Sequence, residues 1–199
     1  MKKNIRIMGI IMTMLIVTSA HAKMYDQTPK EHVKIKNTEI TSESKNEKNA
    51  KDLYNKIKKL ETLKDKKGRQ LYRLKYESNN DLYNTCIIIC KNETENFNRF
   101  HIASIIIQES KFCHKAVNRT DGGKGLAQVM KRYWGKEFPW YKNEFDKNQS
   151  IKACTLVLEK NFSRHNNVWK AIKHYNGSNE KATQYSKKIQ NTYSKLLIA

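Results

Sequence analysis

The sequence has little proline, no internal repeat and no cysteine or histidine pair at metal-ligand spacing. Proline accounts for only 2 of the 199 residues, so few positions interrupt a helix. We therefore predict a mostly α-helical fold, with five or more helices around one core. The cysteines, Cys86, Cys90, Cys113 and Cys154, include no Cys-x-x-Cys pair, so neither a metal site nor a cofactor is predicted.

Acidic residues are scarce relative to basic ones. The chain has 19 Asp and Glu against 39 Lys and Arg, which gives a net charge of +20. Such an excess predicts attraction to a polyanion. The candidates are nucleic acid, an anionic membrane surface and an acidic polymer such as peptidoglycan, and charge alone does not choose among them.

The longest hydrophobic run, Met8–Val17, has about half the ~20 residues that a membrane span needs. Basic residues precede the run, and Ser19–Ala22 follows it as a small-residue ending. This pattern predicts a secretory signal peptide over residues 1–22, cleaved after Ala22, with an uncleaved membrane anchor as the alternative. No cysteine lies near the cleavage point, so no lipoprotein anchor is expected.

Export would bring the protein to the cell wall and away from nucleic acid. Loss of Lys2, Lys3 and Arg6 with the signal peptide would change the net charge from +20 to +17. We interpret this positive charge as a means of binding the carboxylates of the cell wall. We expect no nucleic-acid partner and no stable membrane anchor. The predicted location is the periplasm or cell envelope.

Exported chains commonly use their cysteines in disulfides. Cys86 and Cys90 lie one helical turn apart, where a bond between them would constrain little. We expect two bonds that join their helix to Cys113 and to Cys154. Buried free thiols are the alternative, and the sequence does not fix the pairing.

Three segments follow the predicted signal peptide. Residues 23–50 are polar and rich in Lys and Asn, which predicts a disordered linker. Residues 51–77 carry Leu and Ile at helical spacing, with Gly68 as a candidate break, which predicts a helical extension of two short helices. The extension could dock on a partner or on the wall, or pack loosely as a solvated helix on the main domain, residues 78–199.

Several helices are predicted in the main domain besides the one that ends at Glu109. Three isoleucines leave a strand over Cys86–Cys90 as an alternative to a helix there, and Gly177 fits the end of the helix predicted over Val168–Tyr175. The predicted helices cover Asp81–Cys90, Ser150–Asn161, Val168–Tyr175 and Ala182–Leu197.

An apolar helix ends at Glu109. The segment Phe97–Ile107 carries apolar residues on nearly every side, so the helix should be buried. Burial disfavours a charged carboxylate and should raise the pKa of Glu109, which keeps a proton available near neutral pH. Such a group is suited to general acid catalysis. Alternatively, Glu109 caps the helix end or pairs with a lysine.

Four short motifs occur in order along the main domain: Glu109-Ser110, Gly125-Leu-Ala-Gln128, Ala171–Gly177 (AIKHYNG) and Tyr185–Ile189 (YSKKI). Together they resemble the soluble, lysozyme-like lytic transglycosylases of glycoside hydrolase family 23, which carry an SLT domain. The resemblance covers roughly Asp81–Leu197 and implies a mostly α-helical, lysozyme-like fold. The sequence departs from the family pattern in the Ala before Gln128, usually a Met, and in the absence of the usual Pro after the Gln.

The resemblance also implies a chemistry. Family members cleave the bond between N-acetylmuramic acid (MurNAc) and N-acetylglucosamine (GlcNAc) in peptidoglycan, and they form 1,6-anhydro-MurNAc with a single glutamate and no cofactor. By position, Glu109 would be both the general acid and the general base. Tyr175 and Asn176 would lie opposite Glu109 and orient it and the sugar. Tyr185 would contact the residues around Glu109 without touching it directly. The implied substrate-binding residues are Ser110, Gln128, Tyr175, Asn176 and Tyr185.

Two other functions stay open. A goose-type-like lysozyme would hydrolyse the same bond with Asp121 as a second carboxylate, although Asp before two glycines is also an ordinary turn. A non-catalytic wall-binding or assembly protein would use the positive charge alone. Trp134, Trp140 and Tyr141 fit either stacking on sugars or covering a small core. The expected partners are peptidoglycan glycan strands and a secretion or conjugation apparatus, because small exported enzymes of this kind open the wall locally for secretion, conjugation or pilus systems or for a phage.

Overall fold

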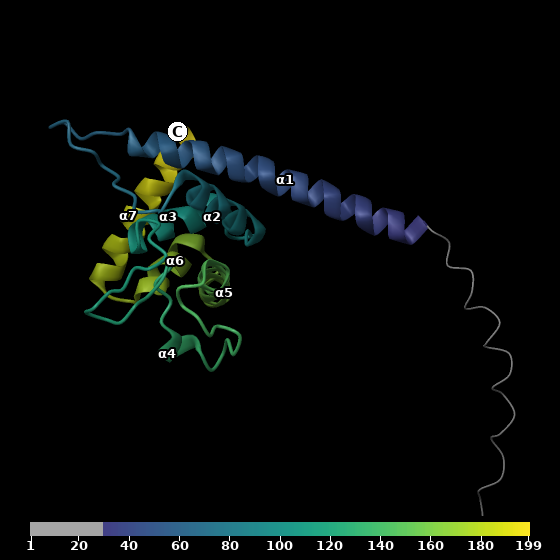
Figure 1. The fold of residues 1–199 in the computed structure, drawn as a ribbon. Coiled ribbons are helices and arrows are strands. Elements are labelled where there is room, and N and C mark those ends of the chain that lie inside the picture. Colours follow the sequence, from purple (N-terminus) through teal and green to yellow (C-terminus); the bar gives the residue numbers. More distant parts are fainter. Residues whose placement is uncertain (1–29) are drawn as a thin grey trace, which may run out of the picture. The chain divides into compact units, whose positions relative to one another are not determined.

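The computed structural model describes the backbone of residues 30–199 and the side chains of residues 43–199. This part of the chain forms seven α-helices and no named strand, which confirms the prediction of a mostly α-helical fold (Figure 1). The predicted signal peptide and the first residues of the predicted linker lie outside the described residues. The helices are α1 Lys30–Glu61, α2 Asn79–Lys91, α3 Arg99–Glu109, α4 Lys131–Trp134, α5 Lys147–His165, α6 Val168–Asn176 and α7 Glu180–Ile198.

Helix α1 replaces most of the predicted linker. Its 32 residues include neither proline nor glycine, and Lys and Glu, which favour helices, are frequent. From Lys30 onward the structure thus has a helical backbone where the sequence predicted a disordered linker, and a polar composition rich in Lys and Glu is compatible with a helix. No helix of the described residues is long and apolar enough to cross a membrane. The chain divides into two units, residues 1–42 and 43–199, and the second contains every residue of the candidate site.

The second half of α1 belongs to the hydrophobic core of residues 43–199. Its apolar face, formed by Leu53, Ile57 and Leu60, is fully buried in a cluster with residues of α2, α3 and α7. The side-chain amine of Lys56 donates a 3.2 Å hydrogen bond to the carbonyl oxygen of Leu197 near the end of α7. This part of α1 is packed into the core, and it is not the loosely attached helix that the sequence suggested.

No helix forms between α1 and α2, so the predicted second helix of the extension is wrong. Lys64 and Gln70 form an isolated antiparallel bridge around a turn at Gly68, whose φ of 75° suits glycine. The chain then reaches Ser78, whose hydroxyl accepts a 3.0 Å hydrogen bond from the backbone N–H of Asp81 and caps α2. Helix α2 is continuous, which excludes the alternative strand within it.

Helix α3 is buried along most of its length, as predicted. It begins at Asn98, whose side chain accepts hydrogen bonds from N–H groups of the first turn. Eight successive residues, Phe100–Ile107, are buried. Ile102 packs into the first hydrophobic cluster with α1 and α2, whereas Ile105 packs into a second cluster with α5, α6 and α7. Packing on both sides therefore fixes the helix end that carries Glu109.

The four cysteines are free thiols, so the prediction of two disulfides is wrong. Cys86 and Cys90 lie in the first hydrophobic cluster, whereas Cys154 lies in the second. Because α3 contributes side chains to both clusters, these thiols pack on different sides of it and cannot meet. Cys113 is half-buried, and the other three are buried. The alternative of buried free thiols therefore holds for Cys86, Cys90 and Cys154.

Candidate active site

Glu109 is the last residue of α3, and it is half-buried. The pKa of Glu109 is raised from 4.5 to about 7: desolvation of the carboxyl group is the main cause, a hydrogen bond from Tyr185 acts in the opposite direction, and the charge of Asp121 adds to the rise. None of the ion pairs within residues 43–199 involves Glu109. With a pKa near neutrality, the group can both release and accept a proton at physiological pH.

Tyr185, from α7, is in direct contact with the acid. Its hydroxyl donates a 2.6 Å hydrogen bond to Oε1 of Glu109. Burial, followed by the charge of Glu109, raises the pKa of Tyr185 well above its ordinary value, so the phenol remains a donor. The structure thus places Tyr185 closer to the acid than the resemblance implied.

Tyr175 lies at the end of α6 and holds the loop that precedes Gln128. Its hydroxyl donates a 2.7 Å hydrogen bond to the carbonyl oxygen of Ala127. Burial raises the pKa of Tyr175 well above its ordinary value, and the proximity of Cys154 and Glu109 adds to this effect. Tyr175 therefore lies near Glu109, but its hydroxyl donates its hydrogen bond to Ala127 and not to Glu109.

The Gly-Leu-Ala-Gln motif forms a tight loop that Tyr175 contacts. Gly125 has a φ of 75°, and a side chain there would overlap the carbonyl oxygen of Glu144. Gln128 also has a left-handed backbone, with φ of 54°. Its amide nitrogen donates a 2.8 Å hydrogen bond to the carbonyl oxygen of Gly125. Its amide oxygen lies beside Gly123, where an added Cβ would come within 2.7 Å of it.

A sharp turn directly follows the acid. Ser110 is buried, and its hydroxyl donates a 3.2 Å hydrogen bond to the carbonyl oxygen of Ile106, which closes the last turn of α3. Lys111 and Phe112 then have φ values of 56° and 65°. Two successive non-glycine residues in this region are uncommon and carry backbone strain. This turn could not be predicted from the residue types, because neither Lys nor Phe favours the left-handed conformation.

Two further candidate residues, Asn176 and Asp121, are exposed. Asn176 is the last residue of α6, and its side chain is open to solvent. Asp121 lies in an exposed turn, where Oδ2 accepts a 2.8 Å hydrogen bond from the amide of Asn118 and Oδ1 accepts a 2.9 Å bond from the N–H of Gly123. Asp121 thus forms the ordinary turn that its two following glycines suggested.

The aromatic residues after Gln128 form a stack that covers the second hydrophobic cluster. Tyr141 is buried, and its hydroxyl donates a 2.9 Å hydrogen bond to the carbonyl oxygen of Val129. Trp134 stacks on Phe138, with ring centroids 5.5 Å apart, and Phe138 stacks on Trp140 at 5.8 Å. Tyr141 is therefore a core residue, whereas the two tryptophans are half-buried at the edge of the cluster.

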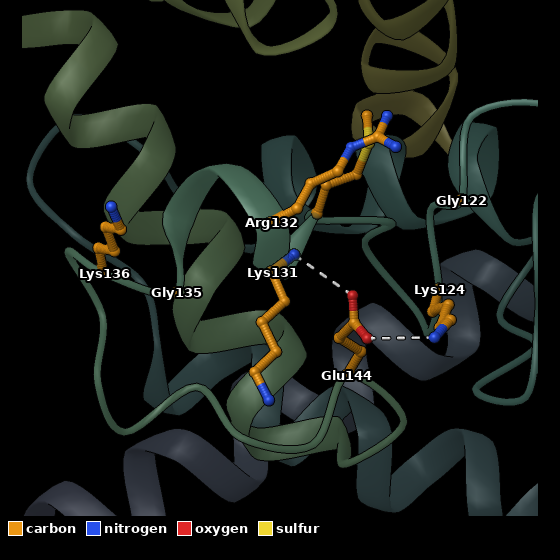
Figure 2. Close-up of a pocket in the computed structure, with 8 residues that line it drawn as sticks. Gly122, Lys124, Lys131, Arg132, Gly135, Lys136 and Glu144 are labelled. Carbon is orange, nitrogen blue, oxygen red and sulfur yellow. Dashed lines mark hydrogen bonds and ion pairs between the residues drawn. The ribbon is translucent and has the colours of Figure 1, made fainter.

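A hollow of about 530 Å³ is lined by residues that follow Glu109 in the sequence, and Glu109 itself is not among them. Figure 2 shows basic side chains around Glu144, with dashed lines from Glu144 to Lys124 and Lys131. We call this hollow the basic pocket. Its lining residues are Gly122, Lys124, Met130, Lys131, Arg132, Gly135, Lys136 and Glu144.

Glu77, Asp81 and His114 place possible metal-ligand atoms within 4.8 Å of one another. Each carboxylate already has a lysine partner: Lys115 donates a 2.8 Å hydrogen bond to Glu77, and Lys147 pairs with Asp81. The group is therefore accounted for as an ion-pair network in which the lysines balance the carboxylates.

The described residues form a lysozyme-like helical domain in which one half-buried carboxyl group with a raised pKa accepts a hydrogen bond from a tyrosine. The sequence model of the transglycosylase SLT domain matches residues 86–198, more than half of the chain, and the chain belongs to this family. Its members are lytic transglycosylases, lyases that act on the glycosidic bonds of peptidoglycan, so the predicted family and enzyme class are confirmed. Searches of curated proteins and of solved structures found no match.

Proposed function

We propose that Glu109 acts first as the acid and then as the base in the cleavage of peptidoglycan strands. Its proton goes to the oxygen that bridges C1 of MurNAc and the neighbouring GlcNAc, and the bond from C1 to that oxygen breaks. The Glu109 carboxylate then takes the proton of the MurNAc 6-hydroxyl, whose oxygen bonds to C1. The products are a 1,6-anhydro-MurNAc end and a GlcNAc end, no water is consumed, and Glu109 is protonated again.

The observation that carries this proposal is the half-buried Glu109 carboxyl group, which accepts a hydrogen bond from Tyr185. A pKa of about 7 lets the group hold a proton before cleavage and take one afterwards near neutral pH. The hydroxyl of Tyr185 stabilises the carboxylate that exists between the two transfers, because a hydrogen bond to a charged acceptor is stronger than one to a neutral acceptor.

The remaining candidate residues would position the glycan and the loops around it. The exposed side chain of Asn176 is free to bind sugar hydroxyl or acetamido groups. Gln128 would line the cleft, and Tyr175 would support it by holding the carbonyl oxygen of Ala127. Ser110 would act by closing α3 behind the acid, since its hydroxyl already bonds to Ile106.

Hydrolysis with Asp121 as a second carboxylate is the other candidate, and one observation favours it. The charge of Asp121 contributes to the raised pKa of Glu109, so the two groups are close enough to interact. However, both oxygens of Asp121 accept hydrogen bonds within their own turn. A carboxylate so engaged is less available to activate water, and we favour the anhydro route.

Digestion of insoluble peptidoglycan in isotope-labelled water, followed by mass spectrometry of the soluble products, tests this mechanism. The anhydro route predicts ends that are lighter by one water and contain no labelled oxygen. Reducing ends that contain the label would support hydrolysis and contradict the proposal. Asp121→Asn is the matched variant: it should retain the anhydro products, whereas under the hydrolytic route it would lose activity.

We further propose that the protein works in the periplasm or cell envelope, after export by the predicted signal peptide. Family membership supports action on the cell wall. Local opening of the wall would suit a secretion, conjugation or pilus apparatus or a phage. Family membership also makes a non-catalytic wall-binding role the weaker alternative. Cell fractionation of the full-length protein tests the location, and recovery in the cytoplasm alone would contradict it.

A further inference from the structure

The basic pocket contains four cationic side chains and one carboxylate. Glu144 uses both of its oxygens: Oε1 accepts a 3.3 Å hydrogen bond from the backbone N–H of Lys131, and Oε2 lies 3.6 Å from Nζ of Lys124. The side-chain amine of Lys131 donates to a backbone carbonyl. Arg132 and Lys136 pair with no carboxylate of the described residues. The pocket therefore carries unneutralised positive charge.

One turn of chain connects this pocket with the acid. Asp121 lies in that turn and interacts electrostatically with Glu109. The next residue, Gly122, lines the pocket, and a Cβ there would lie 3.9 Å from the guanidinium group of Arg132. The pocket therefore borders the turn that contains Asp121, whose charge contributes to the raised pKa of Glu109.

The charge and size of the pocket match one part of the proposed substrate. The sugar rings of peptidoglycan offer neutral hydroxyl and acetamido groups, whereas the short peptide attached to each MurNAc carries free carboxylates. Arginine and lysine bind carboxylates through charge-assisted hydrogen bonds, and the arginine fork can bind both oxygens at once. A volume of about 530 Å³ lies within the range of pockets that hold small ligands.

We propose that the basic pocket, through Arg132 and Lys136, binds the carboxylates of the peptide stem and makes the enzyme prefer glycan strands that carry peptides. Lys124 and Lys131 hold the pocket together through Glu144 and add to its positive charge. The preference in cleavage rests on the proposed function, whereas the binding of the peptide does not.

Cleavage of two kinds of glycan strand tests the preference. One kind retains its peptides, and the other has been stripped of them by an amidase. We expect the rate ratio, peptide-bearing over stripped, to fall about fivefold in Arg132→Ala/Lys136→Ala, which corresponds to about 1 kcal/mol. The control, Lys187→Ala/Lys188→Ala, removes the same charge from an exposed face of α7 and should keep the wild-type ratio. A wild-type ratio in the pocket variant would overturn the proposal.

A binding experiment decides the proposal without cleavage. Isothermal titration of the full protein with L-alanyl-D-glutamyl-meso-diaminopimelic acid should show binding that weakens with salt. Binding should also weaken about fivefold in Arg132→Ala/Lys136→Ala, or when the carboxylates of the peptide are amidated. No binding, or equally tight binding of inorganic phosphate, would overturn the assignment to peptide carboxylates. If the wild-type protein cuts neither kind of strand, the proposed function fails, and this titration still decides the role of the pocket.

Discussion

The hydroxyl of Tyr185 donates a 2.6 Å hydrogen bond to Oε1 of Glu109, across 76 residues of sequence. The bond joins α7 to the end of the buried helix α3. It lowers the pKa of Glu109 while burial raises it. The pKa near neutrality is therefore a balance between an apolar environment and one phenol, and the balance can be tested.

Tyr185→Phe should raise the pKa of Glu109 further and slow cleavage. The carboxylate formed after proton transfer would lose its donor, and a hydrogen bond to a charged group contributes about 1.5–3 kcal/mol, so we expect a loss of tenfold or more. The alkaline limb of the pH–rate profile should move to higher pH, because the acid would keep its proton longer. Rates of peptidoglycan cleavage across the pH range measure both effects.

Tyr175→Phe is the control for that experiment. Its hydroxyl bonds to the carbonyl oxygen of Ala127 and not to Glu109, so its loss should reduce activity by loosening the loop without moving the pH profile. If the two variants gave the same pH profile as the wild-type protein, Tyr185 would have no part in setting the pKa of Glu109.

Glu109→Gln should abolish cleavage while leaving the fold intact. The amide keeps the shape of the side chain but has no transferable proton, and general acid–base catalysis contributes about 10²–10⁴-fold. Circular dichroism establishes that the variant is folded, and release of soluble fragments from peptidoglycan gives its activity. A folded variant that loses less than roughly threefold would remove Glu109 from the proposed role.

The same substitution should change how stability depends on pH. The pKa of Glu109 is about 7 in the folded protein against 4.5 ordinarily. Below pH 4.5 the group is protonated whether the chain is folded or unfolded, but as the pH rises through 7 the folded protein must bury a charge. The free energy of unfolding of the wild-type protein should therefore fall by up to about 3 kcal/mol over this range relative to Glu109→Gln.

Urea unfolding of both proteins at about pH 5 and about pH 8 measures this difference. Glu109→Gln should be closer to the wild-type stability at the lower pH and relatively more stable at the higher pH. An equal difference in unfolding free energy at the two pH values would show that the carboxyl group is not desolvated in the folded protein.

Gly125→Ala should destabilise the protein more than Gly68→Ala does. Both glycines have φ of 75°, so both substitutions place alanine in the left-handed region at a cost of about 1 kcal/mol. Only at Gly125 would the new Cβ also overlap the carbonyl oxygen of Glu144, since nothing lies near Gly68. Chemical denaturation measures the two losses, and equal losses would contradict the close approach.

Shortening the chain to residues 43–199 should leave a folded protein, whereas residues 78–199 alone should melt at a much lower temperature. The shorter chain lacks Leu53, Ile57 and Leu60, which are fully buried. Burial of each such side chain contributes about 1.5–3 kcal/mol, a large share of a total stability of about 5–15 kcal/mol. Thermal unfolding followed by circular dichroism decides the matter, and equal melting temperatures would favour a boundary near Ser78.

The helix that ends at Glu109 could be predicted because apolar residues surround it on every side, and only a buried helix satisfies that pattern. The hydrogen bond from Tyr185 could not be predicted, because the partner of a hydroxyl depends on how α7 is rotated by packing. The sequence also did not show that Lys111 and Phe112 adopt positive φ, since residue type sets no such preference there. Export suggested disulfides, but the sequence did not show that Cys86 and Cys90 pack in a different hydrophobic cluster from Cys154, and all four cysteines are free thiols.

The free thiols bear on how the protein can be made and probed. With Cys86, Cys90 and Cys154 buried and unbonded, folding requires no oxidising enzyme, and the same structure should form in a reducing cytoplasm or in an oxidising envelope. Cys113 is the half-buried exception, four residues after the acid. A thiol-directed dye should therefore label Cys113 well before the other three, which provides a native reporter close to the end of α3.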